Sequence, residues 1–501
     1  MNPKATARRE PAVALVLAGL VLLALVLRFW RLGEWNFQAT EMFTLRDSLT
    51  PKLTNPRPLS YFLTSYLVGS FRPLDEFGLR LLPAVFGVLA VPTVYLVGRR
   101  LAGVQAALIS ALLVALSPLQ IMYSQLARYW SLVFLLSAIY PYAIYVGIRE
   151  RSRGWLALGC VSAILAILAH PVSVLLLGGL GLYLVAGLRR EDFARLWSQK
   201  AIRWTVAVAL VLGTAILVRF IPLLKGWISM HDRNPGSGQF FRPPATAQGI
   251  KQVIYLGNFV ESLTVPIVLC AIAGIYLLWK GRDRSLAGLL ASLAVFHVGF
   301  LTLLSLRTSV GQYYLLPAVP VFYFGAGIFI DQLFRLEVPW RPRWLLPALA
   351  VAMCVAAGAA TLISDAWDGR RYDFRNSARW LAPRLQPADI VFSDQPMVLA
   401  HYLPQHPVRH LRPFLKFLTE AMSELRQSGR GGSLWIVAPA ASHAHRPNLK
   451  QGGIINWIYD SCQLRNTIGV GRIDFRQNYL QIYQCPSLMP DAPARRQADS
   501  R

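Results

Sequence analysis

Long apolar runs separated by short polar segments dominate the chain between residues 12 and 363. The hydrocarbon core of a bilayer is about 30 Å thick, so a spanning helix needs about 20 consecutive apolar residues. Each run therefore predicts a membrane-spanning helix, eleven in all. The runs cover residues 12–30, 78–98, 101–117, 128–148, 154–170, 171–188, 203–222, 257–279, 285–305, 313–331 and 344–363.

The runs at 154–170 and 171–188 meet at His170 and Pro171, and can also be taken as one long buried element. Proline disfavours helix at the residue before it. We therefore predict two helices that meet at a tight re-entry.

Basic residues bracket the runs, and their placement decides what the net charge of +26 implies. The chain is 54% hydrophobic and 15% charged, whereas a soluble domain is about 25% charged. A high positive charge alone would suit nucleic acid, but clusters beside apolar runs are what the positive-inside rule expects of short cytoplasmic loops. The clusters are Lys4, Arg8 and Arg9; Arg99 and Arg100; Arg149, Arg151 and Arg153; Arg189 and Arg190; Lys280, Arg282 and Arg284; and Arg335, Arg341 and Arg343.

If the N-terminus is cytoplasmic, all of these clusters fall on one side of the membrane. An odd number of helices then puts the C-terminal region outside. Richness in alanine, arginine and leucine is typical of a GC-rich bacterium. We expect an integral protein of a bacterial inner membrane, with no nucleic acid as partner.

Three segments outside the membrane are long enough to form structure: residues 31–77, 223–256, and the chain from 364 onward. The first mixes aromatic, leucine and polar residues, which predicts short helices in the membrane interface. Strand-like pieces after 364 ("DIVFSD", "SLWIVAP", "NYLQIYQC") and an amphipathic helix ("FRNSARWLAPRL") predict a small α/β or α+β domain. The expected domains are a transmembrane domain over 1–363, an extracytoplasmic domain over 364–490 and a disordered tail over 491–501.

Two of the five cysteines lie in the polar C-terminal region. Cys462 and Cys485 can pair in a disulfide if this region faces an oxidising compartment. Cys160, Cys270 and Cys354 lie in apolar runs and are expected to be small core residues.

The stretch "YSQLARYW", Tyr123 to Trp130, falls where the predicted third helix leaves the membrane and the fourth re-enters it. Arg128 can bind a lipid phosphate there, or its long side chain can simply reach the interface from a helix end. A cavity with one carboxylate, several guanidinium groups and aromatic rings suits a substrate with a phosphate, a sugar and a lipid tail. The other polar groups expected at this outer face are Glu41, Arg57, Arg80, His170, Arg307, Tyr313 and Tyr314.

These segments and their order resemble the GT-C glycosyltransferases, in the branch of the protein O-mannosyltransferases and the lipid A aminoarabinose transferase. The resemblance covers nearly the whole chain in layout. It rests on "FQATEMFTLRD", "PLSYFL", "GLRLLPAVFGVLAVPTVYLVGRRL", "SPLQIMYSQLARYWSL", "ILAHP" and "YYLLPAVPVFY". It implies an enzyme that transfers a sugar from a polyprenyl phosphate to a glycan, lipid or protein acceptor on the extracytoplasmic side.

One departure from the family concerns the catalytic carboxylate. The family usually has Asp followed by Glu in the first loop, with the aspartate in the catalytic role, whereas this chain has Thr40 and Glu41. Three alternatives stay open: Glu41 is the base, another carboxylate such as Asp47 is the base, or the chain has lost activity. We favour Glu41. Leu126 stands where relatives often have glutamate, which weakens a metal-binding role for its segment.

The chemistry of transfer assigns a role to each candidate residue. Polyprenyl phosphate is a good leaving group, so transfer can proceed by one displacement with inversion while Glu41 takes the acceptor proton. Guanidinium matches phosphate in bidentate geometry, so Arg57, Arg128 and Arg307 are expected to bind the donor phosphate. Tyr129 is expected to join them at the lipid donor. The expected substrate-positioning residues are Gln125, His170, Tyr313 and Tyr314.

No protein-held metal site is predicted, because the chain has neither an HExxH nor a paired CxxC motif. A divalent cation that bridges Glu41 and the phosphate stays open as a cofactor. Two rival functions also stay open. A lipid or saccharide transporter would carry ionisable groups within its helix centres, and a catalytically altered protein of the same fold would explain the missing aspartate.

Overall fold

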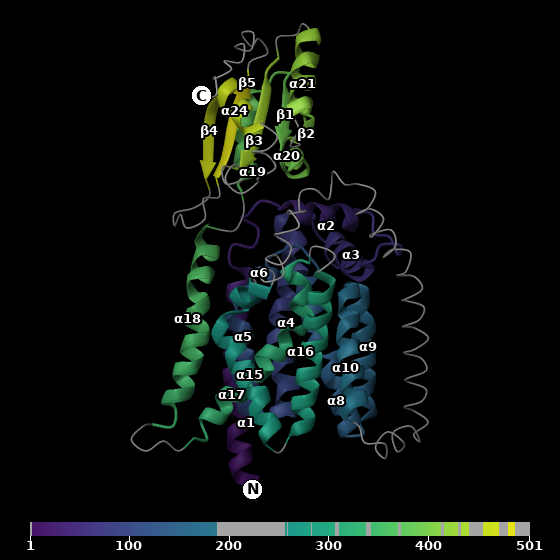
Figure 1. Ribbon diagram of the computed structural model, residues 1–501, viewed down its shortest axis with the longest axis vertical. Coiled ribbons are helices and arrows are strands. Elements are labelled where there is room, and N and C mark those ends of the chain that lie inside the picture. The colour runs from purple at the N-terminus through teal and green to yellow at the C-terminus, as the bar shows by residue number, and fades with distance from the viewer. Residues whose placement is uncertain are drawn as a thin grey trace, which may run out of the picture. The chain divides into compact units, whose positions relative to one another are not determined.

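The chain forms two compact units, seen in a computed structural model (Figure 1). The larger unit comprises Met1–Leu32 and Thr44–Leu362, and the smaller unit comprises Gly33–Phe43 and Ile363–Arg501. The structure describes residues 3–187, 256–257, 259–281, 283–305, 310–336, 342–368, 372–411, 415–428, 432–439, 454–469 and 479–485.

The larger unit is helical. Two helices, α2 (Ala39–Leu49) and α18 (Leu345–Asp368), each begin in one unit and end in the other. Three short turns accompany the helices: the π-helix η1 (Ser65–Gly69) and the 3₁₀ turns η2 (Pro171–Ser173) and η5 (Gln312–Ala318). The remaining helices are α1 (Pro3–Phe29), α3 (Pro58–Thr64), α4 (Glu76–Ala102), α5 (Val104–Leu116), α6 (Pro118–Ser124), α7 (Trp130–Ser137), α8 (Tyr140–Arg149), α9 (Arg153–Ala169), α10 (Val174–Gly187), α15 (Val265–Lys280), α16 (Arg284–Ser305) and α17 (Val319–Leu333).

Each predicted apolar run within the described residues falls on helix, and the run at 203–222 lies outside them. In the described part of the chain, six helices are long and apolar enough to cross a bilayer, and the bent pair α5–α6 adds a seventh if it is one span. α9, α10 and α15 are apolar but shorter. The count of eleven spans therefore stays a prediction.

Polar contacts fix the bend of 57° between α5 and α6. α5 ends at Leu116, because Pro118 has no N–H with which to continue the helical hydrogen bonds. The Ser117 hydroxyl accepts a hydrogen bond from the Gln120 N–H at 3.4 Å and another from the Tyr323 hydroxyl at 2.6 Å. Ser117 is thus the N-cap of α6 and also a contact to α17.

Arg28 reaches the same bend from the end of α1. Its guanidinium is fully buried and donates to the carbonyl oxygens of Val114 at 2.9 Å and Ala115 at 3.1 Å. The last carbonyls of a helix have no partner within the helix and carry partial negative charge. The C-terminal end of α5 therefore stabilises the buried charge, and the contact ties α1 to α5.

Glycine allows α15 and α17 to approach closely. A Cβ atom on Gly274 would lie 2.0 Å from the carbonyl oxygen of Gly325. Small residues let helix backbones pack against each other where no hydrophobic effect drives them together. A larger residue at Gly274 would force the two helices apart.

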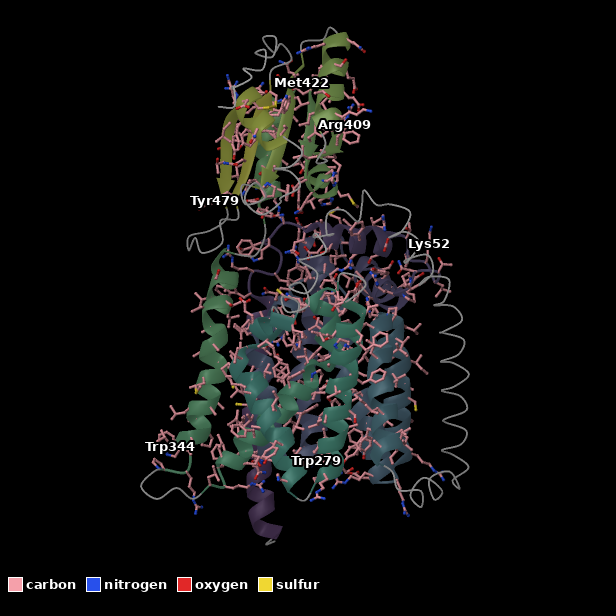
Figure 2. The ribbon with its side chains drawn as sticks, in the orientation of Figure 1. Lys52, Trp279, Trp344, Arg409, Met422 and Tyr479 are labelled. Carbon is pink, nitrogen blue, oxygen red and sulfur yellow. A yellow bond between two sulfur atoms is a disulfide. The ribbon has the colours of Figure 1, made fainter. Side chains whose placement is uncertain are left out.

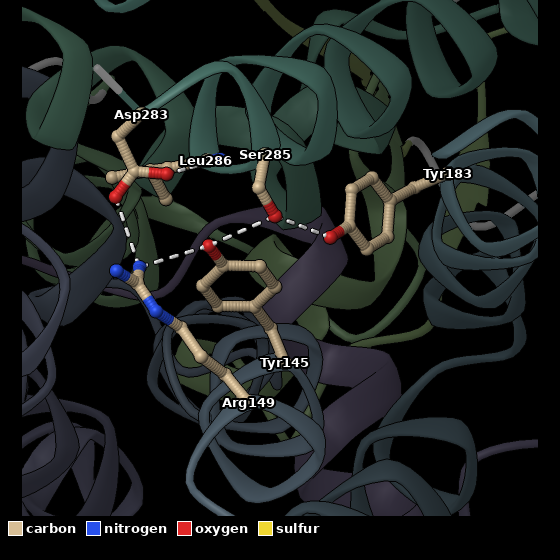
Figure 3. A network of polar contacts seen from close by, with 6 residues as sticks. All are labelled: Tyr145, Arg149, Tyr183, Asp283, Ser285 and Leu286. Carbon is tan, nitrogen blue, oxygen red and sulfur yellow. Dashed lines mark hydrogen bonds and ion pairs between the residues drawn. The ribbon is translucent and has the colours of Figure 1, made fainter. Parts of the chain in front are cut away.

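A polar network joins α8, α10 and the start of α16 (Figure 3). Arg149 lies 2.9 Å from the Asp283 carboxylate and donates to the Tyr145 hydroxyl at 3.1 Å. The Ser285 hydroxyl accepts from Tyr145 at 3.3 Å and lies 2.7 Å from the Tyr183 hydroxyl. These contacts link helices that are far apart in the sequence.

Exposed tryptophans mark one end of the helical unit. Trp279 and Trp344 are 55% and 61% exposed, and Figure 2 shows both at the end of this unit opposite Lys52. Tryptophan is enriched where membrane helices meet water. Lys280 and Arg343 are their chain neighbours, so this aromatic belt lies beside basic residues of the kind that the positive-inside rule assigns to the cytoplasm.

The first outside segment holds the short elements α2, α3 and η1. After α3, the large side chains of Tyr66, Leu67 and Phe71 are 62%, 55% and 83% exposed. Short helices that present apolar side chains in this way are typical of the membrane interface. The interfacial helices expected over 31–77 therefore correspond best to α3 and η1.

A five-stranded mixed sheet forms the centre of the smaller unit. Strands β1 and β2 are parallel, as are β1 and β3, whereas β5 is antiparallel to both β3 and β4. β1 and β3 are buried along their whole length, as is usual for parallel strands covered on both faces. The strands are β1 (Ile390–Ser393), β2 (Val408–His410), β3 (Leu434–Pro439), β4 (Gln463–Gly469) and β5 (Tyr479–Cys485), in the order β2-β1-β3-β5-β4. The helices are α19 (Phe374–Leu381), α20 (Pro396–Tyr402), α21 (Leu415–Ser428) and α24 (Ile454–Ser461).

Two side-chain contacts hold this sheet together. The buried Asp389 carboxylate accepts from the Ser433 N–H at 2.6 Å and from the Trp435 indole at 3.0 Å, which fixes the start of β1 against β3. Cys462 and Cys485 form a disulfide that joins the end of β5 to the start of β4.

The smaller unit also includes residues that the sequence places in the membrane domain. Residues 31–77 are expected to belong wholly to that domain, whereas Gly33–Phe43 pack with the C-terminal residues. The second boundary, at Ile363, lies within one residue of the expected one. The expected disordered tail, 491–501, lies outside the described residues. The sequence does not predict this grouping of Gly33–Phe43, the early segment, because the residues that it packs against lie hundreds of positions away.

Asp283→Ala is expected to lower the free energy of unfolding by about 1 kcal/mol, the usual cost of losing an N-cap. The Asp283 carboxylate accepts from the Leu286 N–H at 3.0 Å at the start of α16. The ion pair with Arg149 should contribute less, because that side chain is 54% exposed. Thermal unfolding of the purified protein measures the effect, with Asp283→Asn as the control that keeps a capping oxygen. Equal losses in both variants would assign the stability to the ion pair instead.

Candidate functional site

Breaks between helices bring most of the candidate residues together in the larger unit. Pro58 and Pro171 each begin the element that follows a break. Proline suits the first position of a helix, because the N–H it lacks would have no partner there. The candidates found at these breaks, and in the 3₁₀ turn η5, are Arg57, Arg128, Tyr129, His170, Tyr313 and Tyr314.

Two guanidinium groups lie against the ring of Tyr129. Arg57 Cζ is 4.9 Å from the ring centroid and Arg128 Cζ is 4.7 Å from it. Arg128 also donates to the Tyr129 hydroxyl at 3.0 Å and to the Thr44 hydroxyl at 3.3 Å. An aromatic ring attracts a cation within about 6 Å of its centroid. The ring therefore allows two like charges to approach each other.

The backbone of Arg57 is held in place, while its guanidinium is left with an unsatisfied donor. The Arg57 N–H donates to Asn55 at 3.0 Å, and Asn55 in turn donates to Asp47 at 3.1 Å. Among the described residues the guanidinium of Arg57 is in no ion pair, and its buried Nε has no hydrogen-bond partner. Burying an N–H donor without an acceptor costs free energy. An anionic ligand would supply that acceptor.

Trp130 connects Tyr129 to the other aromatic side chains. Its ring centroid lies 4.7 Å from that of Tyr129, 4.8 Å from that of His170 and 5.0 Å from that of Tyr313. The centroids of Tyr313 and Tyr314 are 4.6 Å apart. Tyr129, Trp130 and His170 are buried, whereas Tyr313 is 37% exposed. The rings form one aromatic layer with an exposed edge.

His170 is a neutral hydrogen-bond donor within this layer. Its Nδ1 accepts from the Val172 N–H at 3.1 Å, so the proton of the neutral ring lies on Nε2. Nε2 is buried and has no partner among the described residues. The ring therefore offers one N–H to a ligand.

A small pocket, partly open to solvent, adjoins Arg128 and Tyr129. The Ser60 hydroxyl in its wall is buried and has no partner in the described part of the chain. A pocket lined by both polar and apolar side chains suits a ligand with a polar head and an apolar chain. The polar lining is Thr44, Ser60, Thr64, Arg128 and Tyr129, and the apolar lining includes Leu79, Leu82, Pro83, Phe86 and Leu132.

Contacts from α16 and from the start of η5 hold the tyrosine pair in place. His297 is fully buried in α16, and its Nε2 lies 2.8 Å from the Tyr314 carbonyl oxygen. A Cβ atom on Gly311 would lie 2.4 Å from the Tyr313 ring, so only glycine fits there without a shift. Both contacts help to set where the exposed edge of the aromatic layer lies.

Two other residues of the expected outer face, Gln125 and Arg80, make contacts elsewhere, and a third is not described. The Gln125 amide donates to the carbonyl oxygens of Leu27 at 3.1 Å and Trp30 at 3.0 Å, and so caps the end of α1. Arg80 is fully buried and donates to a backbone carbonyl that follows α1. Arg307 lies outside the described residues.

Glu41 lies in the first turn of α2, in the smaller unit. It is fully buried, and one carboxylate oxygen accepts from the Gln38 N–H at 2.9 Å. This contact is half of a capping box, in which a glutamate of the first turn closes back on the residue before the helix. The positive end of the helix dipole also stabilises a carboxylate there. Its pairing with Arg128 stays a prediction, because the two residues belong to different units.

Sequence reasoning missed Ser60, Thr44 and Trp130 as parts of the site. Ser60 and Thr64 are four residues apart in "PLSYFLT" and share a helix face, so a polar stripe on a short interfacial helix was a usable signal. The contact from Arg128 to Thr44 spans 84 positions and leaves no local pattern.

A metal site receives no support from side-chain clustering. Among the described residues, no three carboxylate, imidazole or thiol side chains gather where they could hold an ion. A cation that bridges Glu41 and a phosphate would need only one protein ligand, so this observation does not bear on it.

Comparisons with known proteins relate this site to a family. The family model of the dolichyl-phosphate-mannose-protein mannosyltransferases matches residues 57–218, which include Arg57, Arg128 and His170. ArnT from Cupriavidus metallidurans aligns over 95% of this chain and 98% of its own, with a TM-score of 0.53 and 15% identity in the apo state. Its structure bound to undecaprenyl phosphate aligns over the same shares, with a TM-score of 0.53 and 16% identity. The family model covers less than half of this chain and the solved structures show a shared fold; together they indicate the GT-C glycosyltransferase superfamily.

Two further likenesses are informative. The oligosaccharyltransferase of Archaeoglobus fulgidus aligns over 94% of this chain and 76% of its own, with a TM-score of 0.56 and 12% identity, which shows a shared fold. The galactan 5-O-arabinofuranosyltransferase of Mycolicibacterium smegmatis is 28% identical over 239 residues. That match covers 46% of this chain and 37% of the relative. The apolar helices of the described residues, together with these likenesses, indicate an integral membrane protein.

Proposed function

We propose that this protein is a membrane glycosyltransferase that transfers a sugar from a polyprenyl phosphate to an acceptor on the extracytoplasmic side of a bacterial inner membrane. The observation that carries the proposal is the pair of guanidinium groups of Arg57 and Arg128 at Tyr129, beside a small pocket lined by both polar and apolar side chains. A lipid-linked sugar phosphate needs cations for its phosphate and an apolar surface for its chain.

In this proposal the donor phosphate binds Arg57 and Arg128. Negative charge grows on the phosphate as it leaves the sugar, and preorganised cations stabilise that charge. Guanidinium forms paired hydrogen bonds to phosphate oxygens. The His170 N–H and the Ser60 hydroxyl are further donors for phosphate or sugar oxygens. Undecaprenyl phosphate, which is bound in one ArnT structure, is the lipid phosphate we infer for this chain.

The sugar is inferred from the relatives. The family model is named for mannose transfer and the mycobacterial relative for arabinofuranose transfer, so these two sugars are the first candidates. The exposed edge of the aromatic layer at Tyr313 offers a surface against which the apolar face of either sugar can stack. The acceptor is a glycan, lipid or protein hydroxyl.

Glu41 is the base in this proposal. The acceptor oxygen attacks the anomeric carbon, the bond to the lipid phosphate breaks, and Glu41 takes the acceptor proton, which inverts the anomeric centre. Its burial and its contact with the Gln38 N–H support this role, because they hold the carboxylate in one orientation. The rival base, Asp47, is paired with Arg46 and accepts from Asn55.

The proposed orientation places the smaller unit outside the cell. A disulfide between Cys462 and Cys485 supports an oxidising compartment for this unit. The tryptophans beside Lys280 and Arg343 support a cytoplasmic location for the end of the helical unit at which they lie.

Arg128→Ala is expected to weaken the binding of undecaprenyl phosphate at least about tenfold, because a hydrogen bond to a charged group contributes about 1.5–3 kcal/mol. Arg128→Lys keeps the charge without the planar fork and should fall between. Arg151→Ala, which alters an exposed arginine next to the end of α8, is the matched control and should bind normally. Native mass spectrometry of the full-length protein in nanodiscs gives the dissociation constants. Unchanged binding by Arg128→Ala would remove the basis of the proposal.

Glu41→Gln tests the chemical step separately. The amide keeps the shape of the side chain but takes no proton, so the transfer rate should fall by about 10²–10⁴-fold while undecaprenyl phosphate binds as in the wild type. Radiolabelled polyprenyl-phosphoryl arabinofuranose and mannose serve as donors, with cell-envelope extract of the native host as acceptor. Asp47→Asn is the matched control. Full transfer by Glu41→Gln and loss of transfer in Asp47→Asn would reassign the base.

A further inference from the structure

The segment that carries Glu41 packs on α20 of the smaller unit. The Phe37 N–H donates to the Tyr402 hydroxyl at 2.9 Å, between residues 365 positions apart. The Phe37 ring is 1% exposed and meets the His401 ring edge-on, with 5.3 Å between the centroids. Phe37 therefore receives a polar contact from Tyr402 and a ring contact from its neighbour His401, both in α20.

A third contact lies beside the first two. Arg375, in α19, donates to the Glu34 carbonyl oxygen at 3.2 Å. Its guanidinium carbon also lies 5.6 Å from the centroid of the Tyr402 ring, and the His401 and Tyr402 rings are 4.9 Å apart. The early segment is therefore held at Glu34 and at Phe37 by side chains of two helices.

Phe37 is linked to Glu41 by consecutive hydrogen bonds. Its neighbour Gln38 donates its N–H to the Glu41 carboxylate at 2.9 Å. The Gln38 carbonyl accepts from the N–H groups of Glu41 at 2.9 Å and Met42 at 3.2 Å. Because each bond joins adjacent parts of one turn, fixing the backbone at Phe37 also fixes the carboxylate of Glu41.

The helix that makes these contacts is itself anchored in the core of the smaller unit. Val398 and Leu399 of α20 are fully buried, and the strands on either side of α20 in the sequence, β1 and β2, pair in parallel. Close packing of this kind leaves a helix little freedom to shift. The position of Tyr402 is therefore set by the sheet, and not by the early segment that it contacts.

We propose that the C-terminal unit is a positioning domain, in which Tyr402 and His401 hold the segment Gly33–Phe43 and so orient Glu41 for proton transfer. This inference rests on the proposed role of Glu41 as base. Tyr402 and His401 are positioning residues that act through Phe37. A domain that only binds acceptor or recruits a partner would leave the geometry of Glu41 independent of α20.

Hydrogen exchange of the full-length protein in nanodiscs tests the contact directly. Tyr402→Phe removes the hydroxyl acceptor and keeps the ring, and His401→Ala removes the apolar contact. Amides of residues 37–43 should exchange about tenfold faster in Tyr402→Phe and faster still in the double variant, because a lost hydrogen bond permits local opening. Arg409→Ala breaks an exposed ion pair with Glu424 in the same unit and is the matched control. Protection of β3 amides verifies that the unit stays folded.

Transfer assays with the same two labelled donors complete the test. Tyr402→Phe should lower kcat several-fold while the binding of undecaprenyl phosphate stays unchanged, and Arg409→Ala should change neither. Unchanged exchange over residues 37–43 in the double variant overturns the proposal. Faster exchange with unchanged kcat in an active protein also overturns it. If the wild type transfers neither sugar, the proposed function fails, and the exchange data alone decide whether α20 holds the segment.

Discussion

A guanidinium group that loses contact with water needs an anion or the electron-rich face of an aromatic ring nearby. The ring of Tyr129 serves two arginines in this way. Arg57 and Arg128 both lie within 5 Å of its centroid. The two positive charges would repel each other in these partly apolar surroundings, and the attraction of each charge to the ring offsets part of this repulsion. The free-energy cost that remains for the two guanidinium groups is offset when an anion binds. The candidate site therefore depends on the placement of Arg57 and Arg128 at the Tyr129 ring.

The helical unit holds this arrangement in place by ending helices early. Arg57 precedes α3, Tyr129 follows the short α6, and His170 separates α9 from η2. A continuous helix would satisfy the backbone hydrogen bonds at these points. Its successive side chains, however, would point in different directions around the helix axis. Arg28 shows the other outcome for a buried arginine, since two of its nitrogens bind the last carbonyls of α5 and tie the fold together. The two kinds of arginine differ in what they contact.

The sequence predicted what depends on local pattern. The apolar runs mark the described helices, and "DIVFSD", "SLWIVAP" and "NYLQIYQC" contain strands β1, β3 and β5. His170, Tyr313 and Tyr314 could be proposed from the sequence because polar groups at helix ends stand out against apolar runs. The packing of Gly33–Phe43 with the C-terminal unit was missed, as were Thr44 and Ser60 beside Arg128, because such contacts join distant segments or rest on small side chains. Side-chain contacts alone also show Gln125 as a cap of α1.

A density map of the full-length protein in a nanodisc with undecaprenyl phosphate tests the central claim most directly. The account predicts phosphate density within hydrogen-bonding distance of both Arg57 and Arg128, with the first isoprene units along the apolar side chains of Leu82, Phe86 and Leu132. Phosphate density away from these two guanidinium groups, with the pocket at Tyr129 closed by side chains, would contradict it.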